Sequence, residues 1–276
     1  MTRKTLLCGQ RRTGKGWMRR VACFSFGATC AGAALFSGIS DLYAAPIVHG
    51  DYIGATVDYL GVQEESATDP GATLFAAPTI SGDSLDFNPT NFAATASGAN
   101  GNDITDSNLQ FDVMAHAGKG IQSLSITEAG DASLAGFSND ALASVTTNVF
   151  VDILELNGTT PVSINVQADL AFSPSNGTYQ LSVVGGPTFN TAWSGNVLLD
   201  LSSYLPNTSD LVTKIHVSLD NTLTALSQDG TSAFIQKKDA DASAISIDIN
   251  TLPEPTSLLV ALTGVAAVFG LRRRNG

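Results

Sequence analysis

Alternation of apolar and polar residues with a period of two runs through most of this chain, and it constrains the fold more than any other feature. Apolar side chains recur at every second position over 162–170, 215–219 and 245–249. A β-strand places successive side chains on opposite faces, so this pattern predicts strands with one buried face. We therefore expect an all-β protein, an antiparallel β-sandwich with a jelly-roll-like arrangement of strands.

Two Asn-Gly pairs, Asn157-Gly158 and Asn176-Gly177, separate three of the expected strands. Asn and Gly both tolerate the positive φ angles of a tight turn. We therefore expect the three strands to form an antiparallel meander. The stretch 81–108 is rich in Ser, Gly, Asn and Thr, which predicts long loops, and 139–144 could form one helical turn.

The N-terminal segment has the pattern of a secretory signal peptide. Arg19 and Arg20 precede a long uncharged stretch, and the small residues Ala44 and Ala45 follow it. This order of positive charge, apolar stretch and small residues is typical of a segment that signal peptidase removes after export by the translocase. We expect cleavage between Ala44 and Ala45.

The last 24 residues carry three further features in a fixed order. Prolines lack the backbone N–H that helices and sheets need, so a segment with two of them stays extended. The uncharged stretch that follows can form a transmembrane helix, and arginines hold the end of the chain on the cytoplasmic side. In order, the features are the motif Pro253, Glu254, Pro255 and Ser257, the uncharged stretch 258–271, and a basic stop of Arg272, Arg273 and Arg274.

This tail, 253–276, closely resembles the PEP-CTERM sorting signal of exported bacterial surface proteins. The resemblance implies processing by a membrane enzyme of the exosortase type. It also implies that the protein stays in the inner membrane only transiently, through its C-terminal helix, before it reaches the cell surface or the medium. Bacteria with this system often make extracellular polysaccharide, which implies a place in that matrix. Since such proteins share the tail and not one body fold, no binding residue follows from the resemblance.

These signals divide the chain into five segments. The short tail after the apolar stretch is expected on the cytoplasmic side of the membrane, and Met18 is an alternative start of translation. The segments are a signal peptide, 1–44, a β-sandwich domain, 45–250, a linker with the sorting motif, 251–257, a transmembrane helix, 258–271, and a basic tail, 272–276.

Charge and cysteine content exclude several classes of function for the body. All three cysteines lie in the expected signal peptide, so disulfides and thiolate chemistry are excluded after cleavage. Between residues 45 and 252 there are 23 acidic and 4 basic residues, a net charge of −19. Such a body repels nucleic acid, and we expect no nucleic-acid partner.

Two binding sites can be proposed from the residues of the body. Asn100, Asn102, Asp103 and Asp106 place oxygen donors close together in sequence, and Ca²⁺ binds six to eight such oxygens. Calcium is the one cofactor that the sequence suggests. Trp193 is the one tryptophan of the body, and it could either belong to the core or stack on a sugar.

Catalysis has weaker support in the sequence. The carboxylate pairs Glu64-Glu65 and Glu128-Asp131 could in principle serve a glycoside hydrolase, which needs two carboxyl groups across a sugar cleft. In so acidic a chain, solvated carboxylates are the simpler interpretation. We therefore expect a non-enzymatic surface or extracellular-matrix protein. The alternatives are a carbohydrate- or calcium-binding module and, with least support, a secreted glycoside hydrolase.

Overall fold

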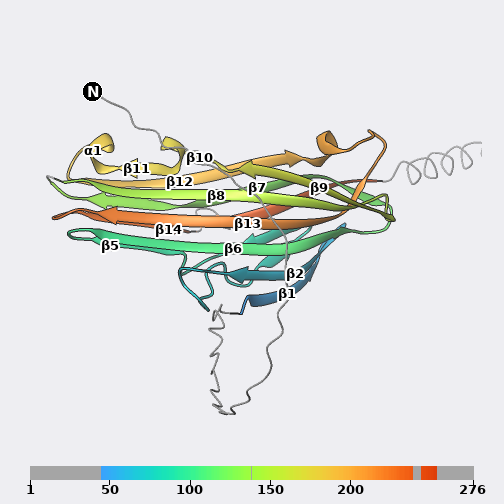
Figure 1. Ribbon diagram of the computed structural model, residues 1–276, viewed down its shortest axis with the longest axis horizontal. Coiled ribbons are helices and arrows are strands. Elements are labelled where there is room, and N and C mark those ends of the chain that lie inside the picture. The colour runs from blue at the N-terminus through green and yellow to red at the C-terminus, as the bar shows by residue number, and fades with distance from the viewer. Residues whose placement is uncertain (1–44, 138, 239–243, 254–276) are drawn as a thin grey trace, which may run out of the picture. The chain divides into compact units, whose positions relative to one another are not determined.

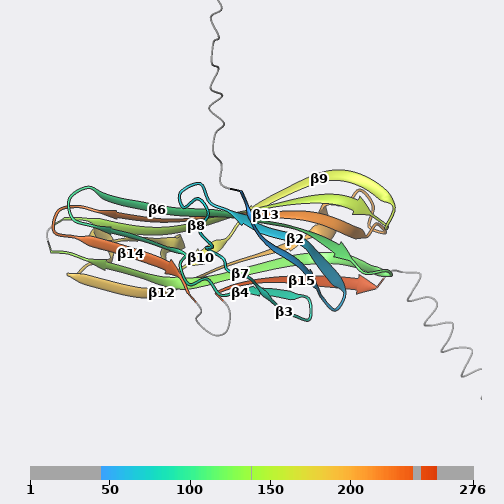
Figure 2. The ribbon, with the colours of Figure 1, turned by 90° about the horizontal axis from the view of Figure 1, so that it is seen from below.

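The computed structural model describes residues 45–137, 139–238 and 244–253, which fold into 15 β-strands with very little helix. All strand pairs are antiparallel, and the strands lie in two layers that face each other (Figures 1 and 2). The prediction of an all-β antiparallel protein is confirmed. The alternation in the sequence has the expected cause, because one face of each long strand packs against the opposite layer.

The first layer is built around β13, which pairs with β6 on one side and β8 on the other over nearly its whole length. The outer strands of this layer pair in turn with β6 and β8. Its strands, in spatial order, are β1 (Ile47–Ile53), β2 (Val57–Glu65), β6 (Gly101–Ala115), β13 (Val212–Ser227), β8 (Ala141–Leu156) and β9 (Thr160–Asp169), with β11 (Thr178–Gln180) beside the start of β8.

The second layer is built around the longest strand, β7 (Lys119–Ala135). One edge of β7 pairs with β12, and the other edge pairs with β15 along its first part and with β14 along its second. The remaining strands of this layer are β12 (Thr188–Asp200), β10 (Ala171–Ser173), β15 (Ile245–Pro253), β4 (Ser84–Phe87), β3 (Thr79–Ser81), β14 (Ser232–Lys237) and β5 (Ala93–Ser97).

The two layers are joined by one bridge between β13 and β7, the pair Val212 and Ile121. Among the described residues, helical structure is limited to α1 (Leu181–Val184) and the two 3₁₀ turns η1 (Ser175–Gly177) and η2 (Leu201–Tyr204). The helical turn expected at 139–144 is wrong, because β8 begins at Ala141. The long loops expected over 81–108 are also largely wrong, since this stretch contains β4, β5 and the first half of β6.

The first Asn-Gly turn forms as predicted and the second does not. Asn157 and Gly158 have φ angles of 55° and 72° and join β8 to β9, which pair directly. After Leu170 the chain instead crosses to the second layer, where β10 pairs with β12. It then returns, and β11 pairs with β8. The predicted three-stranded meander is therefore only a hairpin, because β10 lies between β9 and β11 in the chain and pairs with the other layer.

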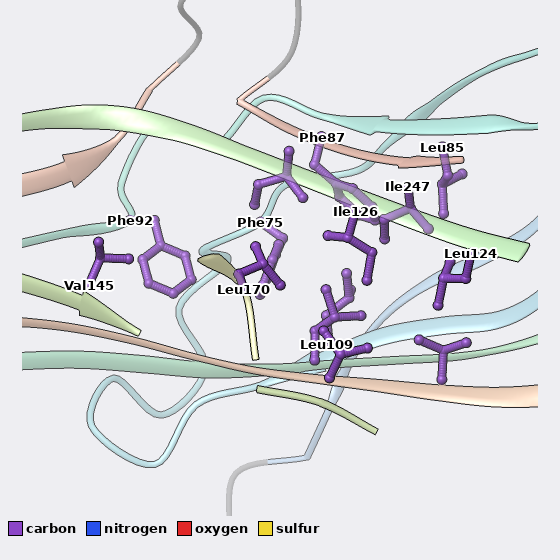
Figure 3. Packing of buried hydrophobic residues seen from close by; sticks show 14 of the residues in the cluster. Phe75, Leu85, Phe87, Phe92, Leu109, Leu124, Ile126, Val145, Leu170 and Ile247 are labelled. Atoms are coloured by element: carbon purple, nitrogen blue, oxygen red, sulfur yellow. The ribbon is translucent and has the colours of Figure 1, made fainter. Parts of the chain in front are cut away.

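The core lies between the layers and consists mainly of aliphatic side chains, with several aromatic ones among them (Figure 3). Phe75 packs edge-on against Phe87 and Phe92, with ring centroids 5.8 and 5.4 Å apart. Leu124 and Ile126 of β7 point into the same interior from the second layer. The core therefore receives side chains from both layers. Burial of these apolar side chains stabilises the long strands, whose outer faces are polar.

The last described strand extends further than the sequence indicates. β15 continues to Pro253, so Thr251 and Leu252 pair with β7 and are not part of a linker. Proline can end a strand at this position because it donates no hydrogen bond to the ladder. The expected linker at 251–257 is therefore wrong at its first three residues, which belong to β15.

Candidate functional site

A hollow of about 510 Å³ lies where β7 turns into β8, beside α1. Its wall comes from three parts of the chain that the fold brings to one end of the two layers: the β7–β8 turn, α1 with the glycines after it, and the turn after β13. The lining residues are Gly136, Phe137, Asn139, Asp140, Leu181, Ser182, Gly185, Gly186 and Gln228.

Asp140 holds the wall of this hollow in place. Its carboxylate accepts hydrogen bonds from the backbone N–H and the hydroxyl of Ser182, at 3.0 and 2.8 Å, and from the side chain of Gln180. These bonds attach β11 and α1 to the start of β8. The bond from Gln180 and those from Ser182 hold the pKa of Asp140 below its ordinary value, so this carboxylate stays ionised at neutral pH.

Two apolar side chains stand out of this end of the molecule. Phe137 is 92% exposed and Val183, on α1, is 78% exposed. The hydroxyl of Ser182 and the amide of Gln228 line the hollow together with Phe137, and Oε1 of Gln228 accepts a hydrogen bond from the backbone of Asp140 at 2.9 Å. An exposed ring beside fixed polar groups can bind a ligand that has both an apolar face and hydroxyl groups.

The described lining of the hollow contains no pair of acidic side chains. Asp140 is the single carboxylate among its described lining residues. Glycoside hydrolysis needs a second carboxyl group across the sugar, and no such group lines this wall. In the described ranges, no group of three or more His, Cys, Asp or Glu side chains is arranged to hold a metal ion.

The structure assigns Trp193 to the core and not to a sugar-binding surface. The residue lies on β12, is 2% exposed, and packs edge-on against Phe172 with ring centroids 5.8 Å apart. The residues on either side of it, Ala192 and Ser194, point outward, as the alternation requires. The alternative that Trp193 stacks on a sugar is therefore wrong.

The four residues proposed for calcium do not meet in a loop. Asn100 lies in a tight turn with a φ of 59°, and the strand β6 begins directly after it. Asp103 points inward, where it accepts a hydrogen bond from the backbone N–H of Thr95 at 2.7 Å. Asn102 and Asp106 point to the opposite face because they are an odd number of residues away. The proposed calcium site is therefore wrong, because its four residues belong to a turn and a strand and do not converge.

Asp106 also has a structural partner of its own. Its Oδ1 accepts hydrogen bonds from the backbone N–H and the hydroxyl of Thr68, at 2.8 and 2.7 Å, and from the backbone of Ala67 at 3.1 Å. These bonds tie the loop after β2 to β6. One of the two oxygens of this carboxylate, Oδ1, is therefore already used by protein donors.

Neither carboxylate pair proposed for hydrolysis forms a facing pair. Glu64 is buried, and its Oε2 accepts hydrogen bonds from the backbone of Leu74 and Phe75 at 2.8 and 2.9 Å, whereas Glu65 points to the other face. Glu128 is enclosed between the layers, and Asp131 lies on the outer face of the same strand. The two inner carboxylates have partners within the fold: Glu64 accepts from backbone N–H groups, and Glu128 from the side chains of Thr147 and Lys237.

Most of the expected targeting residues lie outside the described ranges. Ala45 is the first described residue and Pro253 the last, and both are exposed. No helix in the described ranges is long and apolar enough to cross a membrane. The residues outside are Ala44, Glu254, Pro255, Ser257, Arg272, Arg273 and Arg274, together with the expected helix 258–271.

The residues around the hollow were missed by sequence reasoning. The available signal was a phenylalanine inside the turn sequence Gly136-Phe137-Ser138-Asn139-Asp140, where an aromatic residue has no core to enter. The pair Gly185-Gly186 also marked an irregular segment. Nothing in the sequence indicated that these two segments meet, because their approach depends on the return of the chain to β8.

Comparison with known proteins places few constraints on this chain. No protein-family model matches it, and no curated protein is similar to it. Solved structures do match, among them TmCBM61 in complex with beta-1,4-galactotriose. That match has 12% identity, covers 64% of this chain and 91% of the other, and has a TM-score of 0.18. A similarity of this size supports no inference about the ligand.

Proposed function

We propose that this protein is exported to the bacterial cell surface, where its body acts as a non-enzymatic binding module for extracellular polysaccharide. The body would be a jelly-roll-like β-sandwich. The observation that carries the binding part of the proposal is the exposed ring of Phe137 at the rim of a hollow with a polar wall. A pyranose presents C–H groups on one face and hydroxyl groups at its edge, which matches this combination.

The export part of the proposal is supported by the two ends of the sequence. The signal-like segment 1–44 would be recognised by the translocase and removed by signal peptidase. The tail 253–276 would then hold the protein in the inner membrane until an enzyme of the exosortase type processes it. The body, with 23 acidic and 4 basic residues, would repel acidic polymers, so a neutral polysaccharide is the expected ligand.

The binding experiment compares the purified protein on neutral and acidic polysaccharides, including the extracellular polysaccharide of the producing bacterium. Phe137→Ala removes the ring and is expected to weaken binding to a neutral polymer by roughly two- to tenfold, since an aromatic contact contributes about 0.5–1.5 kcal/mol. Phe150→Ala is the matched control, because Phe150 is a partly exposed phenylalanine on β8 away from the hollow. Equal binding by the protein and Phe137→Ala would reject this site.

The sorting experiment replaces Pro253, Glu254 and Pro255 by alanine in the full chain. We expect the altered protein to remain in the inner membrane while the natural sequence reaches the surface fraction. Arrival of both proteins at the surface in equal amounts would show that the motif does not direct sorting.

A further inference from the structure

A lysine is enclosed in the core between the two layers. Lys237, the last residue of β14, and Glu128 of β7 both have side chains with no exposed surface, and they form an ion pair. Nζ of Lys237 also lies 2.6 Å from Oδ1 of Asn221. The other three lysines of the body are not buried, so this position is unusual within the described chain. A charged group in such a place needs strong compensation.

The residues of this cluster come from both layers. Asn221 on β13 and Thr147 on β8 are direct neighbours across the ladder of the first layer, whereas Glu128 and Lys237 belong to the second. Oγ1 of Thr147 lies 2.8 Å from Oε2 of Glu128 and 2.8 Å from Oδ1 of Asn221. The cluster therefore spans the interior between the two layers.

The hydrogen bonds of this cluster are incomplete. Within the described residues, neither Oε1 of Glu128 nor Nδ2 of Asn221 has a hydrogen-bond partner, and both atoms are buried. A carboxamide nitrogen carries two donors, so Asn221 leaves both of them unpaired. Buried unpaired groups lose the hydrogen bonds they would make with water, which destabilises the folded state. An arrangement that removes these donors would therefore be favoured.

The surroundings of the lysine favour its neutral form. Nζ lies 5.3 Å from the ring centre of Phe92 and 5.7 Å from that of Trp193, and water is excluded. Burial lowers the pKa of Lys237, and Glu128 opposes that effect only in part. Transfer of one proton from the ammonium group to the carboxylate leaves a neutral amine, which is a nucleophile, beside the carboxamide of Asn221.

We propose that Lys237 and Asn221 become joined by an amide bond between their side chains. Nζ of Lys237 attacks Cγ of Asn221, the bond between Cγ and Nδ2 breaks, and ammonia leaves. Glu128 accepts the proton of the ammonium group, passes it to the leaving nitrogen, and takes up the second proton that Nζ loses. The products are a secondary amide, ammonia and a protonated Glu128, so the step needs no oxidant or co-reactant.

The bond would resolve the incomplete hydrogen bonding of the cluster. Both unpaired N–H groups of Asn221 depart with the ammonia. The new amide keeps one N–H, which faces Glu128, and its oxygen stays beside the hydroxyl of Thr147. Two buried charges are replaced by neutral groups, so the cost of enclosing an ion pair also disappears.

The bond would also connect the layers covalently. It joins β13 in the first layer to β14 in the second and closes a loop between residues that are 16 positions apart. A covalent loop restricts the unfolded chain, as a disulfide does. A body without cysteines would gain from it a cross-link that reducing agents do not break. This inference does not depend on the location or ligand of the protein.

Peptide mapping of the full-length protein, purified from the cells that produce it and then unfolded, tests the bond directly. A protease that cuts before aspartate separates 220–228, which contains Asn221, from 229–238, which contains Lys237. We expect these peptides to stay joined, with a combined mass lower by one ammonia. The turns at Asn157 and Asn176 can also lose ammonia, but they lie in other peptides. Two separate peptides of unchanged mass would overturn the proposal.

Variants test the role of each group. Lys237→Met and Asn221→Ala should release separate peptides and melt at a lower temperature, whereas Lys238→Met, next to the site and exposed, should keep the joined peptides. Glu128→Gln keeps both reacting groups and should leave the peptides separate in the folded protein. Joined peptides in Glu128→Gln would overturn the role of Glu128. A variant that fails to fold does not affect the test, since the natural sequence decides whether the bond exists.

Discussion

Trp193 lies directly across the antiparallel ladder from Gly130, and its indole ring fills the space that a side chain at position 130 would occupy. The pair explains why a glycine stands in the middle of the longest strand. It also explains why the one tryptophan of the body is buried and not available to a sugar.

Gly130→Ala should therefore destabilise the body. A methyl group at this position would overlap the indole ring and the backbone oxygen of Gln236. Overpacking of a core typically costs about 1–3 kcal/mol, and chemical denaturation should show a loss of that size. Ser194→Ala, next to Trp193 and pointing outward, is the control and should change stability by less than about 0.5 kcal/mol. Equal stability of the two variants would contradict the packing described.

Glu64→Ala should be strongly destabilising, although Glu64 is an acidic residue in an acidic protein. The substitution leaves the buried backbone N–H groups of Leu74 and Phe75 without their acceptor. Each unpaired buried group costs roughly 1–3 kcal/mol, so a total near 3 kcal/mol is expected in denaturation. Glu65→Ala, one residue further on the opposite face, should be close to neutral. A similar loss in both variants would indicate a general charge effect.

Asp106 should make stability depend on pH in the acid range. Burial alone would raise the pKa of Asp106, but hydrogen bonds from Thr68, Ser66 and Ala67 outweigh it and hold the pKa below its ordinary value of 3.8. A carboxyl with a lower pKa in the folded state stabilises the protein above its unfolded pKa. That contribution is lost as pH falls through the folded pKa.

Asp106→Asn should accordingly be less stable than the natural sequence at pH 7, by roughly 1 kcal/mol for partly exposed bonds. The difference should shrink as pH falls below the ordinary value and vanish below the folded pKa. Melting curves over this range measure it, and Asp229→Asn, in an exposed turn, is the control. A difference that stays constant with pH would show that the charge of Asp106 has no part in it.

The alternation of residues could predict the fold class because buried and exposed faces differ most in the long central strands. It failed in the first half of β6, where Thr105 and Ser107 point inward and are buried, so that the core face is itself polar. A segment with polar residues on both faces is indistinguishable from a loop in sequence, and this produced the incorrect calcium proposal. Trp193 shows a second limit, since core and surface aromatics have the same pattern of neighbours.

The polar cluster in the core could not be predicted because its members are far apart in the chain. Lys237 lies 109 positions from Glu128 and 16 from Asn221, and only the packing of two layers brings them together. The rim of the hollow depends in the same way on the return of β11 to β8. Local pattern thus predicts strands and turns such as Asn157-Gly158, whereas sites assembled across layers require the structure.

The most direct test of the proposed surface function is the intact mass and cell fraction of the native protein, in cells with and without their exosortase-type enzyme. We predict a surface or released form that begins at Ala45 and has lost the apolar stretch after Ser257, and its absence when the enzyme is missing. A protein that keeps 258–276 in the inner membrane in both strains would contradict the account, since the body would then be a permanently anchored domain.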